Sequence, residues 1–325
     1  MSPISVIVPT FRRPESLERA LRSLLTQDRF AELVHEVLVV DNDAAASAHA
    51  TVARLQAGEP RLRYLPCPEP GVSTARNAGV ASTHAPLVAF LDDDEEAPPH
   101  WLATLHDAHV ALGVDVTFGP VRGRADQAPA WKRAYLENFF SRFGPAATVA
   151  IDEVYGCGNS LLTRATTLAG DEPFDVGANE TGGEDDRLFL ALKAGGRRFG
   201  WAADAGVYEH AAANRQTLRY ALVRAFGYGQ SPCQIAARKG CHVTIARWMA
   251  IGAAQAALYG VAAALAMPFR TTTGLMFTDK AVRGLGKMVW FVVLKYYGAP
   301  AAKPAPSSSR FGRVSRMPVA AKITQ

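Results

Sequence analysis

The stretch PLVAFLDDDEE, residues 86–96, joins an apolar run to five consecutive acidic residues. Its first part, Pro86–Leu91, is short and almost entirely apolar, which is typical of a strand buried on both faces of a parallel sheet. In such sheets ligands bind beyond the carboxyl ends of the strands, and the acids Asp92–Glu96 stand at that end. Because neighbouring carboxylates repel one another, the acidic run predicts either a solvated loop or a bound cation.

Segments of alternating strand and helix character lead up to this stretch. Three more buried-type strands are predicted at Ile4–Pro9, Glu36–Asp43 and Leu62–Pro66. Helices are predicted after them, from Pro14 onward, over residues 44–58 and over Gly71–Thr83. This order predicts an α/β domain with a mostly parallel central sheet and helices on both faces, and it brings Asp41 to the same crevice as the acidic run.

The pattern continues less regularly after the acidic run. Strands are predicted at Val116–Val121 and Gly158–Thr163, with an aromatic-rich insertion between them. Gly182–Gly196 has acids in its first turn and glycines at both ends, which predicts a helix. The segment Arg197–His210 is expected to form a β-hairpin or paired short strands.

Charge divides the chain into two unlike halves. Residues 1–210 carry 19 Lys and Arg against 29 Asp and Glu, a net charge of −10, whereas residues 211–325 carry 16 against one, a net charge of +15. Such asymmetry indicates an acidic partner for the basic half. No zinc-finger spacing or RNP motif is present, so we expect no nucleic acid as partner. Basic residues flank apolar segments, which favours an anionic membrane surface.

The basic half begins with a predicted amphipathic helix from about Leu218. Further along the basic half, the segment Trp248–Pro268 has no charged residue over 21 positions, which is long enough to span a bilayer. Because Ala and Gly dominate that segment, we expect the chain to attach to the membrane peripherally or monotopically. The alternative is that the segment forms a buried helix pair that covers the catalytic domain. The predicted domains are residues 1–216, a membrane-associating helical region 217–298 and a disordered basic tail 299–325.

Compartment is indicated by the N-terminus and the cysteines. Met1–Thr10 lacks a basic region followed by a long apolar core, so no secretory signal is predicted. The four cysteines show no CxxC pair and no metal-ligand spacing, which suits a reducing compartment.

Two acidic motifs could carry chemistry. Mg²⁺ or Mn²⁺ commonly uses one or two carboxylates together with substrate phosphates, which the acidic run at a strand end could provide. The sequence GGEDD, residues 182–186, places carboxylates at a helix start, where one could accept a proton from a hydroxyl nucleophile. Each motif also has an interpretation without chemistry. The acidic run could be a solvated turn, and the acids of GGEDD could simply complement the helix dipole.

The ordered set of motifs resembles family 2 glycosyltransferases of the GT-A fold over roughly residues 3–230. The set consists of SVIVPTFRRPESLERALRSLLTQ, EVLVVDND, GVSTARNAGVAST, LVAFLDDDEEAPPHWL, GNSLL and GGEDDRLFLALKAGG. NFFSRFGP, GWAADAGVYEH and RAFGYGQS further resemble bacterial exopolysaccharide glycosyltransferases of the succinoglycan-assembly type.

The resemblance implies residues that bind the nucleotide. Pro9, Thr10 and Arg12 match the loop after the first strand that contacts the nucleotide. Asp41 matches the aspartate that binds uracil or ribose, and Arg76 matches the basic residue near the nucleotide and its diphosphate.

The resemblance also implies a metal site and a base. Asp92, Asp93 and Asp94 match the DxD region, with Asp94 as the main metal ligand; which pair ligates the Mn²⁺ or Mg²⁺ stays open. His210 falls where some GT-A enzymes supply a further ligand, although lone histidines are commonly structural. Asp185 matches the catalytic base, with Glu184 beside it.

The implied activity is that of an inverting hexosyltransferase without a covalent intermediate. The donor is a nucleotide-diphosphate sugar, expected to be a UDP-sugar, and the acceptor is a hydroxyl of a polyprenyl-diphosphate-linked saccharide in exopolysaccharide or cell-surface glycan assembly. The expected location is the cytoplasmic face of the bacterial inner membrane.

Two alternatives stay open. A sugar-nucleotide pyrophosphorylase needs a glycine-rich N-terminal loop, whereas VPTFRRPES contains no glycine. A non-catalytic sugar-nucleotide-binding scaffold would have lost the DxD or the base, and both motifs are present.

Overall fold

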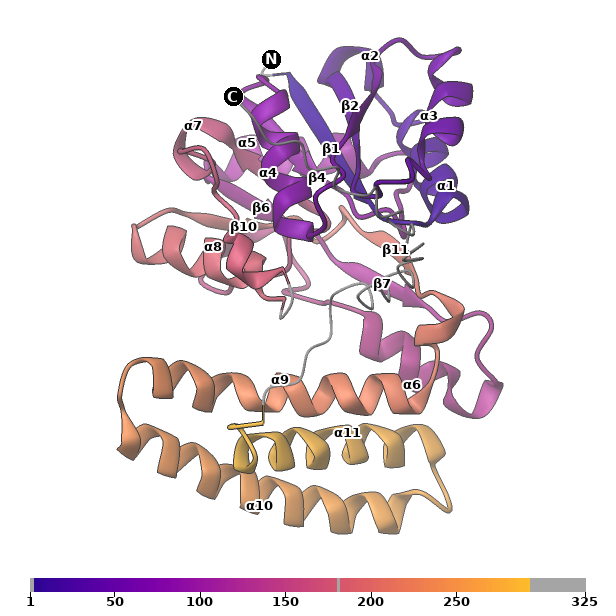
Figure 1. Ribbon diagram of the computed structural model, residues 1–325. Helices are drawn as coiled ribbons and strands as arrows, with labels where there is room; N and C mark the ends of the chain where they lie inside the picture. The colour runs from indigo at the N-terminus through magenta and orange to yellow at the C-terminus, as the bar shows by residue number, and fades with distance from the viewer. Residues whose placement is uncertain (1–2, 180–181, 293–325) are drawn as a thin grey trace, which may run out of the picture.

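The computed structural model describes residues 3–179 and 182–292. A two-sheet α/β unit lies above a layer of three long helices (Figure 1). The central sheet has eight strands in the order β3-β2-β1-β4-β9-β6-β10-β8. Their bounds are β1 Ile4–Thr10, β2 Val34–Asp41, β3 Leu62–Pro66, β4 Leu87–Phe90, β6 Val116–Phe118, β8 Val149–Ile151, β9 Ser160–Thr163 and β10 Phe199–Trp201.

The central sheet is mostly parallel, as predicted. Strands β1, β2, β3 and β4 run parallel to one another, whereas β9 runs antiparallel to both β4 and β6. Strand β10 is parallel to β6, and the edge strand β8 is antiparallel to β10. The fold class given by the strand and helix order is therefore confirmed.

Helices cover both faces of the sheet because β1 alternates its apolar side chains between two cores. Val6 and Val8 pack in one core with residues of α1, α3 and α5, whereas Ile7 packs in the other with residues of α4 and α8. The helix bounds are α1 Pro14–Leu24, α2 Phe30–Leu33, α3 His49–Gln56, α4 Val72–Ser82, α5 Trp101–Leu112, α6 Ala130–Phe140, α7 Arg164–Thr167 and α8 Glu184–Ala194.

A small second sheet corrects two predictions. It contains β5 (Glu95–Glu96), β11 (Val207–His210) and β7 (Val121–Arg124), in the order β5-β11-β7. The predicted strand 116–121 is split between the sheets. The prediction of a β-hairpin or paired short strands at 197–210 is wrong, because β10 and β11 belong to different sheets.

The side chain of Asn159 holds two of the crossings between the sheets, β6 to β7 and β10 to β11. Its Nδ2 donates to the carbonyl oxygens of Pro120 and Ala205, at 2.8 Å each, and its Oδ1 accepts from Trp101 Nε1 at 2.7 Å. Pro120 has no N–H to continue the β6 ladder, so the chain leaves the central sheet there.

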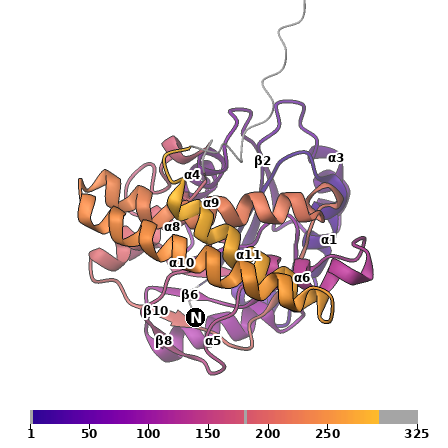
Figure 2. The same cartoon turned by 90° about the horizontal axis from the view of Figure 1, so that it is seen from below.

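The C-terminal helices lie side by side beneath the sheets (Figures 1 and 2). They are α9 (Leu218–Arg238), α10 (His242–Ala266) and α11 (Thr271–Met288). The predicted amphipathic helix is confirmed as α9, and the uncharged segment 248–268 falls mostly within α10. The predicted domain boundaries stay predictions, and the tail 299–325 lies outside the described residues.

Candidate active site

The acidic run lies where β1 and β4 end side by side. Thr10 Oγ1 donates to Asp93 Oδ2 at 2.7 Å, and Arg13 Nη1 donates to Asp93 Oδ1 at 3.0 Å and to Asp94 Oδ2 at 2.8 Å. Asp93, Asp94 and Glu95 are all buried, so the acids do not form a solvated loop. Guanidinium groups offset their mutual repulsion instead.

A second arginine approaches the same carboxylates from the start of the helical region. Arg215 Nη1 lies 3.7 Å from Asp94 Oδ2. Burial raises the pKa of Asp93 and of Asp94, and the positive charge of Arg13 opposes that shift in both. Cations from two distant parts of the chain therefore favour the ionised form of these acids.

Arg76, the predicted diphosphate contact, connects the acidic run to α8. Its Nη1 donates to Glu184 Oε1 at 2.5 Å and its Nη2 to Asp92 Oδ1 at 3.3 Å. The guanidinium carbon lies 5.6 Å from the centre of the Phe174 ring, and the side chain is buried. Its Nε has no hydrogen-bond partner within the described residues. One donor of a buried cation is thus left for another acceptor.

Asp185, the predicted base, lies against a short loop that also contacts the acidic run. Its Oδ2 accepts a hydrogen bond from the backbone N–H of Cys157 at 3.1 Å. A Cβ on Gly158 would lie 2.6 Å from Asp92 Oδ2, and one on Gly156 would lie 3.2 Å from Asp185 Oδ2. The loop 156–158 therefore lies against both the predicted metal-binding carboxylate and the predicted base, and a side chain at position 158 would displace the Asp92 carboxylate.

The two acids of GGEDD have different environments. Glu184 is buried and paired with Arg76, and burial raises its pKa while Arg76 opposes the rise. Asp185 is half-buried and makes no ion pair within residues 3–179 and 182–292. Its carboxylate accepts hydrogen bonds from the backbone N–H groups of Cys157 and, at 2.9 Å, of Asp186. This geometry leaves Asp185 the more accessible of the two carboxylates.

Sequence reasoning missed Arg142, which follows α6. Its Nη2 donates to Glu95 Oε1 at 3.3 Å and to the carbonyl oxygen of Gly158 at 3.2 Å. Burial raises the pKa of Glu95 and of Glu209, and Arg142 opposes both shifts. Arg13, Arg215 and Glu209 were missed as well. The acidic run itself indicates that arginines or lysines must lie nearby, because buried carboxylates require compensating cations.

Three predicted residues lie apart from this network. The buried carboxylate of Asp41 accepts from the backbone N–H of Ala48 at 2.9 Å and from the Tyr64 hydroxyl at 3.0 Å, which orders the turn after β2. Arg12 is largely exposed and donates from Nε to Asp43 Oδ1 at 3.1 Å. Pro9 is buried within β1. The roles of these residues in nucleotide binding stay predictions.

The ring of His210 makes no contact with the carboxylates of Asp92–Asp94 among the described interactions. Its Nε2 lies 2.8 Å from Glu96 Oε2, and only its backbone N–H reaches the carbonyl oxygen of Asp94, at 2.8 Å. In the register of β11 against β5, Tyr208 lies opposite Glu96 and Glu209 lies opposite Glu95. Side chains alternate between the two faces of a sheet, so Glu96 and His210 point to one face and Glu95 and Glu209 to the other.

The donor set can be tested against a divalent ion. Among residues 3–179 and 182–292, no group of three or more His, Cys, Asp and Glu side chains could hold a metal ion. Mg²⁺ nevertheless commonly takes one or two carboxylates plus phosphate oxygens. Asp92 and Asp94 therefore fit an ion that binds together with a diphosphate, and its presence stays a prediction.

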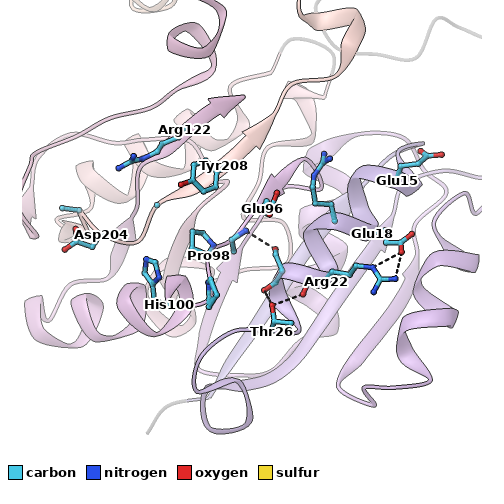
Figure 3. Close-up of a pocket in the computed structure, with 16 residues that line it drawn as sticks. Glu15, Glu18, Arg22, Thr26, Glu96, Pro98, His100, Arg122, Asp204 and Tyr208 are labelled. Carbon is cyan, nitrogen blue, oxygen red and sulfur yellow. Dashed lines mark hydrogen bonds and ion pairs between the residues drawn. The ribbon is translucent and has the colours of Figure 1, made fainter. Parts of the chain in front are cut away.

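A groove of about 1040 Å³ lies apart from the charge network (Figure 3). It runs between α1, the segment after β5 and the second sheet, and Arg22, Glu96, His100, Arg122 and Tyr208 are among the residues that line it. None of the predicted catalytic, nucleotide-binding or metal-binding residues lines this groove. The candidate site therefore rests on the converging ion pairs rather than on this groove.

Comparison with known proteins gives concordant results. The family model "Glycosyl transferase family 2" matches residues 5–167. The chain is 33% identical over 268 residues to the succinoglycan biosynthesis protein ExoM of Rhizobium meliloti, covering 82% of this chain and 85% of that protein. It is 36% identical over 107 residues to a GalNAc(5)-diNAcBac-PP-undecaprenol beta-1,3-glucosyltransferase of Campylobacter jejuni, about a third of either chain.

Solved structures agree with the fold. S. aureus TarS residues 1–349 in complex with UDP-GlcNAc superposes with a TM-score of 0.51 at 18% identity, over 69% of this chain and 66% of that one. The predicted GT-A fold is therefore confirmed. The family model ends before Glu184, Asp185 and His210.

Proposed function

The chain belongs to glycosyltransferase family 2, and we propose that it is an inverting, metal-dependent enzyme that transfers a hexosyl group from a UDP-sugar to a hydroxyl of a lipid-linked saccharide. The observation that carries this proposal is that Asp92 and Asp185 both lie against the loop 156–158. A sugar bound there has the diphosphate-binding acids on one side and a candidate base on the other.

The donor and acceptor classes are supported by named relatives. Two TarS structures are complexes, one with UDP and one with UDP-GlcNAc, which supports a UDP-sugar donor. The Campylobacter relative is named for an undecaprenyl-diphosphate-linked acceptor, and the Rhizobium relative for succinoglycan biosynthesis. We therefore assign a polyprenyl-diphosphate-linked saccharide as acceptor, in exopolysaccharide or cell-surface glycan assembly.

Asp185 acts as general base in this proposal. Its carboxylate accepts the proton of the acceptor hydroxyl as that oxygen attacks the anomeric carbon from the face opposite the diphosphate. The N–H of Cys157, 3.1 Å from Oδ2, fixes the orientation of the carboxylate. One displacement inverts the anomeric configuration, and Glu184 stays paired with Arg76 throughout.

The arginines hold the diphosphate. The guanidinium groups of Arg13, Arg76 and Arg215 each pair with a carboxylate of Asp92–Asp94, where a diphosphate would bind. Asp94 and Asp92 would hold Mn²⁺ or Mg²⁺ together with the diphosphate. When bound, such an ion offsets the negative charge of the leaving group.

We place the enzyme on the cytoplasmic face of the bacterial inner membrane. The net charge of +15 for residues 211–325 favours anionic lipid. Within the described residues one helix, α10, is long and apolar enough to cross a membrane. The helical region is thus the part of the chain that would meet the bilayer, where lipid-linked acceptors reside.

One alternative keeps the fold without the reaction. A sugar-nucleotide-binding scaffold would bind UDP but transfer nothing; the intact Asp92–Asp94 and Asp185 argue against it. Family membership removes the pyrophosphorylase alternative.

The deciding experiment is a donor screen. Purified full-length protein is incubated with a panel of UDP-sugars and membrane lipid extract, with Mn²⁺, with Mg²⁺ or with EDTA. We expect UDP release and glycolipid product that require the metal. UDP binding without transfer or hydrolysis of any donor in the panel would favour the scaffold.

A further inference from the structure

The outer face of α10 is apolar and uncovered in the described part of the chain. No charged residue occurs between Trp248 and Pro268, and little of α10 is buried. Leu258, Val261 and Leu265 are each more than 60% exposed. Their spacing of three and four residues places them on one helix face, and α10 is the outermost layer of the molecule (Figure 1).

Helix α11 packs closely along the inner side of α10. A Cβ on Gly284 would lie 2.6 Å from the Gly252 carbonyl oxygen, so the two backbones are in direct contact. Gln255 Nε2 donates to the carbonyl oxygen of Lys280 at 2.7 Å, and Lys287 Nζ donates to Gln255 Oε1 at 3.0 Å. The two helices therefore behave as one unit.

This packing bears on how α10 can meet a bilayer. Helix α11 carries Asp279, Lys280, Arg283 and Lys287 within nine residues. If α10 crossed the membrane with α11 attached, these four charges would enter the hydrocarbon, where charged side chains are costly. If α10 crossed alone, the Gly252–Gly284 contact and the Gln255 hydrogen bonds would be lost.

We propose that α10 lies in the plane of the membrane interface, with its outer face in an anionic phospholipid bilayer and α11 directly above it. This proposal rests on the membrane association given under Proposed function and specifies its surface and orientation. An interfacial helix keeps the Gly252–Gly284 contact intact and leaves the charges of α11 at the depth of the headgroups.

In this proposal the lipid headgroup binds in a small cavity between the two helices. It measures about 550 Å³ and is lined by Ile251, Ala254, Gln255, Leu258, Tyr259 and Lys280. Lys280 Nζ lies 5.0 Å from the centre of the Tyr259 ring and makes no ion pair within the described residues. Its ammonium group would meet the lipid phosphate, while Ile251 and Leu258 contact the acyl chain.

Charge complementarity selects an anionic lipid rather than a second copy of the chain. Asp279 is the one acidic residue of 211–325; it is buried and its Oδ1 accepts from Arg283 Nε at 2.7 Å. Two copies meeting through this face would bring their exposed cations together without an opposing acid from residues 211–325. An anionic headgroup layer supplies the missing charge.

Vesicle flotation of the full-length chain tests the surface. Vesicles of phosphatidylcholine alone are compared with vesicles that also contain phosphatidylglycerol. Leu258→Asp should lower the partition coefficient at least tenfold, since the leucine leaves the hydrocarbon and a charge repelled by the lipid replaces it. Lys280→Gln should lower it about fivefold on the anionic vesicles and little on the neutral ones.

A matched control distinguishes a specific effect of the α10 surface from a general effect of replacing any exposed apolar side chain by an acid. Val110 on α5 is 61% exposed on the sheet unit, so Val110→Asp makes a comparable change far from α10. Its partition coefficient should equal that of wild type. Equal flotation of Leu258→Asp and wild type would overturn the proposal, as would a wild-type dimer that Leu258→Asp dissociates while vesicle binding is absent.

Thiol labelling tests the orientation. Cys241, directly before α10, is exposed, whereas Cys67, Cys157 and Cys233 are buried. Inverted membrane vesicles containing wild type or the double variant Cys241→Ser/Arg270→Cys are treated with an impermeant maleimide. Both thiols should react from the cytoplasmic side, which is outermost in these vesicles. Protection of one thiol until the vesicles are permeabilised would mean that α10 spans the bilayer and would overturn the proposal.

Donor hydrolysis in detergent keeps this result separate from the proposed reaction. Leu258→Asp should hydrolyse UDP-sugar at the wild-type rate, because α10 contributes nothing to the charge network. A wild type that floats on anionic vesicles but hydrolyses no donor would contradict the proposed function and support the membrane surface.

Discussion

The sheet unit and the helical region differ in where their charged side chains lie and in how they are paired. In the sheet unit, buried carboxylates are paired with arginines from separate loops and helices. Arg76 on α4, for example, pairs with Asp92 and Glu184. In the helical region the single acid, Asp279, is buried, and most of the cations up to residue 292 are exposed. The first arrangement prepares a site for a small charged ligand, and the second leaves a surface that requires an external anion.

The largest expected effect concerns the carboxylate that the network leaves accessible. Asp185→Asn should slow sugar transfer by about 10²–10⁴-fold, the usual contribution of a general base, while UDP affinity stays near wild type. Steady-state transfer rates and UDP titration measure the two quantities. Asp186→Asn, at the exposed neighbouring position, is the control and should be near neutral. Unchanged turnover in Asp185→Asn with a large loss in Glu184→Gln would make Glu184 the base.

Removing a cation from the sheet unit should destabilise it strongly. Arg76→Met leaves Glu184 buried without its partner, so the free energy of unfolding should fall by about 3 kcal/mol or more. Arg122→Met changes an exposed arginine that makes no ion pair within the described residues and should alter stability by less than about 0.5 kcal/mol. Denaturant titration decides, and equal stability of the two variants would mean that the buried network contributes nothing.

The helical region depends on close backbone approach rather than on buried charge. Gly252→Ala would place a Cβ 2.6 Å from the Gly284 carbonyl oxygen and 2.7 Å from Lys287 Cβ, so it should cost roughly 1–3 kcal/mol. Gly260, on the same helix, has no atom within 4 Å of an added Cβ, so Gly260→Ala should stabilise by up to about 1 kcal/mol. Thermal unfolding measures both, and a stabilising Gly252→Ala would show that α10 and α11 separate freely.

Acid should affect the sheet unit through a buried histidine. Burial lowers the pKa of His109 to about 4, and the ring nitrogens lie 2.9 Å from Thr117 Oγ1 and from Thr163 Oγ1. The unfolded chain binds this proton below its ordinary pKa of 6.5, whereas the folded chain does not until about pH 4. His109 therefore makes stability fall as pH drops from 6.5 to 4, by up to about 1.4 kcal/mol per pH unit.

His109→Gln removes this titrating group and should make stability vary less between pH 6.5 and 4. Denaturant titrations at several pH values measure the difference. An equally steep decline in the variant would show that His109 is not the group responsible.

The fold could be predicted from the sequence where local pattern decides it. The buried strands Ile4–Thr10 and Leu87–Phe90 have continuous apolar runs, and the acids after the second of them mark the ligand-binding edge. The split of 116–121 between two sheets could not be predicted, because it depends on hydrogen bonds that Asn159 makes to residues 39 and 46 positions away.

The candidate site was predicted unevenly for the same reason. Its carboxylates occur in two short motifs, Asp92–Asp94 and Glu184–Asp185, whereas its arginines come from four separate loops or helices and only Arg76 was identified. The side of the small sheet on which His210 lies depends on the register of β11 against β5, which no local pattern gives.

The stereochemistry of the product tests the central claim most directly. Full-length protein is supplied with an α-linked UDP-sugar, a divalent ion and lipid-linked acceptor, and the anomeric configuration of the new bond is read from its proton coupling constant. Attack by a hydroxyl that Asp185 deprotonates, from the face opposite the diphosphate, predicts a β-linkage. An α-linkage, or no product although the donor binds, would contradict the account.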